Sequence, residues 1–336
     1  MTEHVKPIPP IWCPGCGDFG VLAAIKKSLS DLKVPLEETV LIGGIGCSGG
    51  IHNFMDGYGF HSLHGRLLAN AVGVKLANPK LTVIAAGGDG DGYAIGMGHF
   101  IHALKKNVSL VYVVMMNETY GLTKGQASPT APVGYRGNVE SPFDAVLTAL
   151  SIPSASFIAR GFSGDPKGAA RLLTEALKYN RERKGFAFVE MLSPCVTYND
   201  TYKLWREKVQ NVTSVSGYDA ADRSRAFSTC LEIMEAGRIP IGMIYRAPED
   251  RRLPSLDQTV LPTLEKAPAT TDISLATNLP RYQKLVDALT EDLRGKGPGR
   301  KGPRRVHVDR IRRHRFPAGG VHHLGPHRIP ARGPGL

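Results

Sequence analysis

An aspartate and an asparagine in this chain each follow an apolar run that is typical of a buried strand. Asp89 lies in the glycine-rich segment 87–92, directly after the run 81–86, and Asn117 directly follows the run 108–116. Because ligands bind at the carboxyl ends of the strands in open α/β sheets, we expect both side chains at that edge. A carboxylate and an amide oxygen suit Mg²⁺, which commonly bridges to phosphate. The pair therefore predicts a magnesium site that holds a phosphorylated ligand, and the glycines let the backbone approach it.

Cys13 and Cys16 form a CxxC pair near the start of the chain. The residues before them contain no apolar segment typical of a signal peptide, which predicts a cytoplasmic protein that needs no disulfides. Clustered cysteines in such a protein favour metal or redox chemistry. Alone, the pair is compatible with a zinc half-site, a redox pair or part of a cluster site. Zinc sites usually offer a second close CxxC or a histidine pair, and the sequence shows neither.

Cys47 and Cys195 each follow a predicted strand and are expected at the same sheet edge as the magnesium site. One CxxC and two separate cysteines can converge into a four-thiolate site, which suits an iron–sulfur cluster. Taken one at a time, Cys47 and Cys195 are equally compatible with small buried residues. Cys230 lies in a helical pattern, and we interpret it as a packing residue.

Gly88-Asp89-Gly90 with Asn117 is similar to the diphosphate-binding motif of thiamine-diphosphate enzymes, which begins Gly-Asp-Gly and ends on Asn after one helix and one strand. An ordinary glycine-rich turn is the alternative interpretation, and the downstream strand and asparagine disfavour it. The other characteristic segments are Trp12-Cys13-Pro14-Gly15-Cys16-Gly17, Gly46-Cys47-Ser48, His64-Gly65-Arg66, 120–130 and 194–199. Together these segments resemble the beta subunit of 2-oxoacid:ferredoxin oxidoreductases, and the likeness covers about residues 8–265.

The resemblance implies thiamine diphosphate, Mg²⁺ and one 4Fe–4S cluster as cofactors. It also implies an oxidative decarboxylation of a 2-oxo acid to an acyl-CoA, with electrons passed to ferredoxin. We favour 2-oxoglutarate as the substrate and place pyruvate next. The implied cluster ligands are Cys13, Cys16, Cys47 and Cys195, and the implied Mg²⁺ ligands are Asp89, Asn117 and the backbone carbonyl of Thr119. The other residues implied to contact thiamine diphosphate are Gly46, Cys47, Ser48, Gly88, Gly90, Gly121 and Leu122.

Two further residues are candidates for contact with the reacting groups. His64 is expected near the reactive carbon of the cofactor, where an imidazole can donate a hydrogen bond or a proton. His52 and His61 are close alternatives for this role, and a structural hydrogen bond is the simpler interpretation of His64. Lys124 lies on a glycine-flanked loop after Asn117, and we expect it to pair with the carboxylate of the oxo acid. A solvated surface lysine is the simpler interpretation of Lys124.

Apolar strand patterns and helical patterns alternate from about residue 20 to residue 195. This alternation predicts an α/β fold, a largely parallel sheet with helices on both faces. We expect a thiamine-diphosphate-binding domain over 1–195, a small beta-subunit extension over 196–265, and a linker and basic tail over 266–336. Thiamine enzymes need a second domain of similar fold, so the resemblance implies an alpha subunit as partner and no activity of this chain alone.

The net charge of +12 is concentrated at the carboxyl-terminal end of the chain. Residues 294–336 hold 12 Lys and Arg against one acid, which leaves about +1 for all the residues before them. With few apolar residues, this tail is expected to be disordered. A nucleic-acid-binding arm is disfavoured because the tail has no regular interleaving of aromatic with basic residues and no folded RNA-binding motif, and a frameshifted gene end is the simpler hypothesis. No apolar run reaches the length of a membrane span.

Two other functions compete with the oxidoreductase. A thiamine-diphosphate decarboxylase or synthase subunit without a cluster would leave the four placed cysteines unexplained. A zinc-stabilised α/β protein that binds nucleic acid through its basic tail would leave the pairing of Asp89 with Asn117 unexplained.

Overall fold

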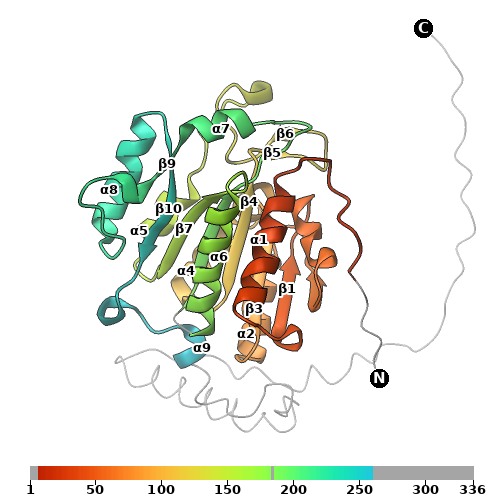
Figure 1. The fold of residues 1–336 in the computed structure, drawn as a ribbon, viewed down its shortest axis with the longest axis vertical. Helices are drawn as coiled ribbons and strands as arrows, with labels where there is room; N and C mark the ends of the chain where they lie inside the picture. The colour runs from red at the N-terminus through yellow and green to blue at the C-terminus, as the bar shows by residue number, and fades with distance from the viewer. Residues whose placement is uncertain (1–6, 183–184, 260–336) are drawn as a thin grey trace, which may run out of the picture. The chain divides into compact units, whose positions relative to one another are not determined.

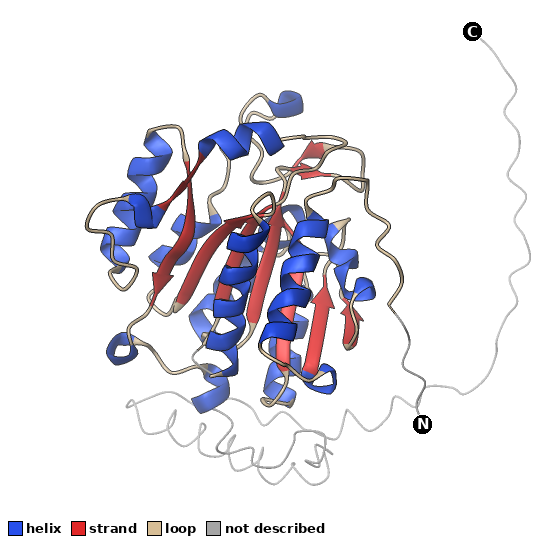
Figure 2. Ribbon diagram, viewed as in Figure 1, coloured by secondary structure: helices blue, strands red, loops and turns tan. Residues whose placement is uncertain are grey.

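The computed structural model of this chain describes residues 7–182 and 185–259. The linker and tail predicted for 266–336 lie outside the described residues. Within them, helices and strands alternate as the sequence predicts (Figure 1, Figure 2). The helices are α1 (Asp18–Asp31), α2 (Leu67–Ala77), α3 (Asp89–Tyr93), α4 (Met97–Lys106), α5 (Ala145–Ser151), α6 (Pro166–Arg181), α7 (Tyr202–Lys208), α8 (Arg223–Glu235) and α9 (Leu256–Thr259). The strands are β1 (Thr39–Gly43), β2 (Tyr58–His61), β3 (Thr82–Gly88), β4 (Val111–Met116), β5 (Thr119–Tyr120), β6 (Gln126–Ala127), β7 (Phe157–Phe162), β8 (Ala187–Leu192), β9 (Val209–Asn211) and β10 (Ile239–Arg246).

Eight strands of the described chain form one sheet in the order β2-β1-β3-β4-β8-β7-β10-β9. All neighbouring pairs are parallel except β7 and β10, which run antiparallel. The predicted α/β class with a largely parallel sheet is thus confirmed. The four strands β1, β3, β4 and β8 are consecutive neighbours, so their carboxyl ends lie along one edge.

Strand β4 shows why the sheet is covered on both faces. All six of its residues are buried, as expected for a strand between two helical layers. Val111, Val113 and Met115 pack with α1 and α6, while Tyr112 and Val114 pack with α2 and α4. Side chains along a strand alternate between the two faces, so one continuous apolar run serves both layers. Figure 1 shows α1 and α6 side by side on the near face of the sheet.

The segment after residue 195 extends the same sheet. Strand β10 pairs with β7, and β9 pairs with β10. Helix α8 places Cys230, which is fully buried, in the same apolar cluster as α2 and α4. This confirms Cys230 as a packing residue. Strands before and after residue 195 therefore belong to one sheet.

Local signals in the sequence explain several helix ends. The carboxylate of Asp165 accepts a hydrogen bond from the backbone of Gly168, and Pro166 occupies the first helical position of α6. Helix α2 ends at Ala77, before Asn78 and Pro79.

The sequence patterns do not predict strand β2 or helix α7. Among the described helices, none combines the length and the apolar character that crossing a membrane requires.

Candidate active site

Four neighbouring strands each lead into a predicted site residue at the same edge of the sheet. Cys47 follows β1, Asp89 follows β3, Asn117 follows β4 and Cys195 follows β8. The two cysteines therefore flank the two oxygen-bearing residues in the order of the strands. The CxxC pair comes from the loop before α1, which crosses to this edge.

Asp89 is held at the start of α3 with 1% of its surface exposed. Its Oδ2 atom accepts hydrogen bonds from the backbone N–H of Glu118 at 3.1 Å, from the hydroxyl of Ser128 at 2.6 Å, and from the hydroxyl of Thr130. Burial raises the pKa of the carboxyl group, and these hydrogen bonds oppose the rise. All three of these bonds are made to Oδ2.

Asn117 and Thr119 shape the loop after β4. The Asn117 side-chain oxygen accepts a hydrogen bond from the backbone N–H of Thr119 at 3.0 Å. Glu118, between them, has a φ of 61°, a left-handed conformation that costs a residue with a side chain about 1–2 kcal/mol. Asn199 donates hydrogen bonds to the Asn117 carbonyl at 3.0 Å and to the Glu118 carboxylate at 3.2 Å. These contacts fix the loop 117–119 beside Asp89.

A cavity of about 270 Å³ opens at the sheet edge beside Asp89 and Asn117. It brings together all eleven residues for which the sequence predicts contact with the diphosphate-bearing cofactor. Gly46 has a φ of 117°, which only glycine adopts without strain. The predicted residues that line the cavity are Gly46, Cys47, Ser48, His64, Gly88, Asp89, Gly90, Asn117, Thr119, Gly121 and Leu122.

His64 reaches this cavity with its ring fixed by Asp91. The Nδ1 atom of His64 lies 2.8 Å from Oδ1 of Asp91, which also accepts the backbone N–H groups of Gly65 at 2.8 Å and Ile45 at 3.0 Å. The sequence assigns no role to Asp91, which is 2% exposed. His52 and His61 do not line this cavity; their rings lie against each other, with centroids 4.7 Å apart.

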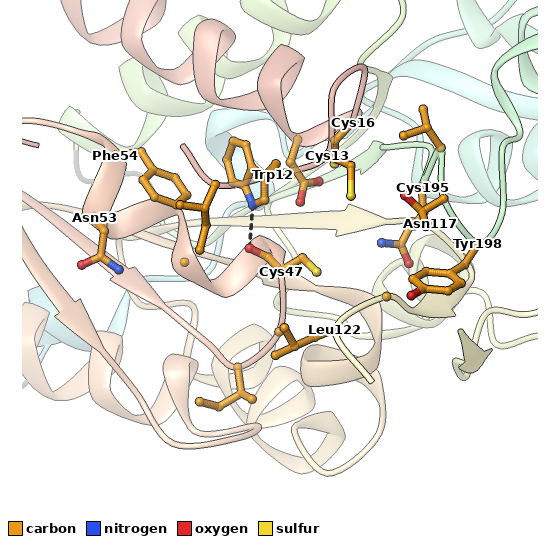
Figure 3. A pocket seen from close by; sticks show the side chains of 18 of the residues that line it. Trp12, Cys13, Cys16, Cys47, Asn53, Phe54, Asn117, Leu122, Cys195 and Tyr198 are labelled. Carbon is orange, nitrogen blue, oxygen red and sulfur yellow. Dashed lines mark hydrogen bonds between the residues drawn. The ribbon is translucent and has the colours of Figure 1, made fainter. Parts of the chain in front are cut away.

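A second cavity, of about 370 Å³, is lined by all four predicted cluster cysteines (Figure 3). Cys13 is exposed, and Cys16, Cys47 and Cys195 are partly buried. Burial, and after it the negative charge of Asp18, raises the pKa of the Cys47 thiol to about 11 and also raises the pKa of Cys16. These thiols therefore stay protonated at neutral pH unless a metal displaces the proton.

Gly121 lies against two of these thiols. A Cβ atom added to it would stand 3.6 Å from the sulfur of Cys47 and 3.6 Å from the sulfur of Cys195. The two sulfurs are thus no more than twice that distance apart. In the described part of the chain, no three His, Cys, Asp or Glu side chains converge closely enough to bind a single metal ion.

Comparison with known proteins identifies the family. Residues 44–191 match the model of the thiamine pyrophosphate enzyme C-terminal TPP-binding domain, and residues 195–258 match the model of the C-terminal region of the pyruvate ferredoxin oxidoreductase beta subunit. A 2-oxoacid:ferredoxin oxidoreductase subunit beta from Aeropyrum pernix is 40% identical over 70% of this chain and 79% of its own length. The chain belongs to the 2-oxoacid:ferredoxin oxidoreductase beta-subunit family.

Other relatives of this beta subunit carry a more specific name. The 2-oxoglutarate synthase subunit KorB of Archaeoglobus fulgidus is 41% identical over 57% of this chain and 72% of its own length. A solved structure, 2-oxoglutarate:ferredoxin oxidoreductase from Magnetococcus marinus with 2-oxoglutarate, coenzyme A and succinyl-CoA bound, superposes with a TM-score of 0.71 and 35% identity. That match covers 83% of this chain and 94% of the other.

Lys124 lines neither cavity of the beta subunit. It is exposed, has a φ of 81°, and lies in the turn between β5 and β6. Its backbone carbonyl lies 3.5 Å from the guanidinium of Arg136. Its predicted contact with the substrate stays a prediction.

Sequence reasoning missed several residues that hold the site of the beta subunit together. Ser128 and Thr130 lie in the segment that carries the family resemblance, but nothing in the spacing indicates that their hydroxyls bond to Asp89. Asp91 stands two positions after Asp89, and the sequence pattern marks it only as part of the glycine-rich turn. Asp18 joins three cysteine-bearing segments through contacts that are distant in sequence.

Proposed function

We propose that this beta subunit binds thiamine diphosphate, Mg²⁺ and one 4Fe–4S cluster. We further propose that it catalyses the CoA-dependent oxidative decarboxylation of a 2-oxo acid and passes the electrons to ferredoxin. The preferred substrate in this proposal is 2-oxoglutarate, with pyruvate next. Bound thiamine diphosphate would supply the carbanion that attacks the keto carbon, and the cluster would accept electrons one at a time.

The observation that carries this proposal is the wall shared by the two cavities. The residues that line both are Ile45, Gly46, Cys47, Asn117, Gly121 and Leu122. A ligand in the cavity of Asp89 and a cluster in the cavity of the cysteines would therefore be separated by single residues. Electron transfer between two such groups requires this proximity, and neither a decarboxylase without a cluster nor a zinc-stabilised binding protein requires it.

The residues around Asp89 fit Mg²⁺ and a diphosphate. Mg²⁺ prefers oxygen ligands and keeps phosphate oxygens or waters in its shell. In our proposal Oδ1 of Asp89 is the ligand atom, since three donors already bond to Oδ2. Asn117 and the carbonyl of Thr119 would add the other protein oxygens.

The residues around the second cavity fit an iron–sulfur cluster better than a single zinc ion. Four thiols line one cavity, but no three of the described potential ligands meet at one ion-sized point. A four-iron cluster is wider than one ion and spreads its thiolates accordingly. Zinc needs its four ligands within about 2.0–2.3 Å of a single centre.

The relatives support 2-oxoglutarate as the substrate and an alpha subunit as the partner. One relative is named 2-oxoglutarate synthase subunit KorB, and the solved structure from Magnetococcus marinus has 2-oxoglutarate and coenzyme A bound. The name of the family itself denotes a beta subunit. In our proposal the alpha subunit supplies the domain that faces the other end of the cofactor.

The experiment that tests the function is an anaerobic visible absorption spectrum of the full chain co-expressed with its alpha subunit. The spectrum is recorded before and after 2-oxoglutarate plus coenzyme A is added, and again with pyruvate. We expect a broad iron–sulfur absorption band that bleaches with 2-oxoglutarate. Bleaching only with pyruvate would reverse the substrate preference. A colourless protein that contains zinc would contradict the proposed cofactor set.

A further inference from the structure

We propose that Asp18 is a positioning residue that fixes the three cysteine-bearing segments relative to one another, so that the four thiols surround one cavity before any cluster is inserted. This inference rests on the proposed function, because it assigns the cavity to an iron–sulfur cluster. Asp18 lines the same cavity as the four thiols but supplies none of the proposed cluster ligands.

The contacts of Asp18 bridge two distant loops. Its Oδ2 accepts a hydrogen bond from the hydroxyl of Ser48 at 2.9 Å, and its Oδ1 accepts one from the hydroxyl of Ser193 at 2.6 Å. Ser48 directly follows Cys47, and Ser193 stands two positions before Cys195. Asp18 itself stands two positions after Cys16. One carboxylate therefore joins every segment that carries a cysteine of the cavity.

The side chain of Asp18 is not used to cap its own helix. Asp18 is the first residue of α1, where an acidic side chain commonly accepts backbone N–H groups, but α1 has no side-chain cap. The residue is 1% exposed, and among the described residues no lysine or arginine forms an ion pair with it. Burying a carboxylate without a cationic partner costs folding free energy unless the group is hydrogen-bonded. The two hydrogen bonds from serine hydroxyls therefore offset the cost of burying Asp18.

Backbone contacts strengthen the same junction. The N–H of Gly17 donates to the carbonyl of Pro194 at 3.0 Å, and a Cβ on Gly17 would stand only 2.6 Å from the carbonyl carbon of Ser193. The indole N–H of Trp12 donates to the carbonyl of Cys47 at 2.7 Å (Figure 3). All these bonds join protein groups to each other, so none of them needs a metal to form.

Pre-positioned ligands lower the cost of building a metal site, because the loops need not be ordered when the metal arrives. Without Asp18, the serine hydroxyls would lose their shared acceptor, and the loops after β1 and before Cys195 would be free to separate. The thiols would then bind the same cluster more weakly and less uniformly.

The test uses the full chain co-expressed with its alpha subunit and stripped of iron. A short bis-maleimide is added, and mass spectrometry measures the yield of the Cys47–Cys195 cross-link. A second, unmodified portion of the same protein is reconstituted anaerobically with iron and sulfide, and its iron content and its electron paramagnetic resonance spectrum after reduction are recorded. The variants are Asp18→Ala, Asp18→Asn and Ser193→Ala. The matched control is Ser28→Ala, which removes a fully buried hydroxyl from the same helix, at a site that contacts α6 instead.

We expect Asp18→Ala to lower the cross-link yield and the iron content by about tenfold, because it leaves two buried hydroxyls without their acceptor. Ser193→Ala should lower both less, since one contact remains. Asn has one acceptor and one donor for the two hydroxyls, so Asp18→Asn should restore the cross-link to within about twofold and recover the wild-type resonance line shape. Ser28→Ala should lower the melting temperature without changing either readout.

A wild-type cross-link yield in Asp18→Ala would overturn the proposal, as would an Asn variant no better than the Ala variant. A Ser28→Ala loss as large as that of Asp18→Ala would show that general destabilisation is responsible, and would also overturn it. If Asp18→Ala does not fold, Ser193→Ala against Ser28→Ala decides the question. Wild-type protein that accepts no cluster would reject the proposed function, while the cross-link in the metal-free chain would still decide the role of Asp18.

Discussion

The imidazole of His64 is bound through Nδ1, at 2.8 Å, to one oxygen of the buried carboxylate of Asp91. That oxygen also accepts two backbone N–H groups, so it acts as an acceptor toward the ring and places the proton on Nδ1. The other ring nitrogen, Nε2, is left for contact with whatever occupies the cavity that His64 lines.

We predict that Asp91→Asn lowers kcat by about 10²-fold with a smaller change in KM, because the ring loses its fixed tautomer and orientation. The measurement is steady-state kinetics of the complex with its alpha subunit. His64→Gln and the double variant complete a thermodynamic cycle. If Asp91 acts through His64, the double variant is no slower than His64→Gln alone. Additive losses of kcat in the double variant would show that the two residues act independently.

Asp89 should control binding of thiamine diphosphate with Mg²⁺. At about 100 times their dissociation constant, ligands stabilise a folded protein by about 2.7 kcal/mol. We expect the corresponding rise in melting temperature in the wild-type complex, and its loss in Asp89→Asn or when a chelator removes Mg²⁺. Asp165→Asn is the control, because Asp165 is exposed and caps α6, a task that Asn performs equally well. An undiminished rise in Asp89→Asn would remove Asp89 from the metal site.

Gly121→Ala should change stability and cluster content in opposite directions. Gly121 does not have a positive φ, so alanine should stabilise the metal-free chain by about 0.4–1 kcal/mol through the unfolded state. The added methyl group would occupy the space between two thiols and reduce iron content. Gly98→Ala, where an added Cβ meets nothing within 4 Å, should stabilise α4 without loss of iron. Urea unfolding and iron analysis measure both effects, and equal iron in the two variants would contradict the prediction.

The cysteines should differ in their reaction with iodoacetamide at neutral pH. The thiolate is the reacting form, and burial raises the pKa of Cys47 to about 11 and that of Cys230 to about 12. In the metal-free chain we therefore expect the exposed Cys13 to react at least about tenfold faster than Cys47. Cys230 should react only on unfolding, and Cys47 should accelerate as the pH rises toward 11. Mass spectrometry of timed samples gives the order, and early labelling of Cys230 would contradict its burial.

The predicted pairing of Lys124 with the carboxylate of the oxo acid can be tested by kinetics. If Lys124 pairs with the carboxylate of the oxo acid, Lys124→Ala should raise the KM for the oxo acid by about tenfold and leave that for coenzyme A unchanged. The neighbouring Arg136→Ala is the comparison, because Arg136 is exposed on the same loop region. Small and equal effects on both substrates would assign Lys124 to the solvated surface.

The sequence predicts the parts of this protein that follow from local patterns. The apolar run that ends at Met116 indicates a strand covered on both faces, and Asp165 with Pro166 indicates the start of α6, as the structure has them. Strand β2 escapes such prediction because its four residues are all exposed and form no apolar run. Its pairing comes from the backbone of β1 alone.

The supporting residues of the site could not be predicted because their partners are far apart in the chain. Asp18 reaches Ser193 across 175 positions, and Thr130 reaches Asp89 across 41. Only the fold determines which hydroxyl meets which carboxylate. The candidate ligands themselves can be predicted from the sequence, because each stands after a recognisable strand or in a CxxC pair.

Strand β2 also bears on how this protein can be handled. It is the last strand at its end of the described sheet, and Tyr58 and Phe60 on it are 62% and 48% exposed. An open edge with aromatic side chains is a template for pairing with another chain. We expect overproduced copies in which this edge stays uncovered to associate edge to edge and precipitate. Solubility during expression therefore reports whether the edge is covered, before any activity is measured.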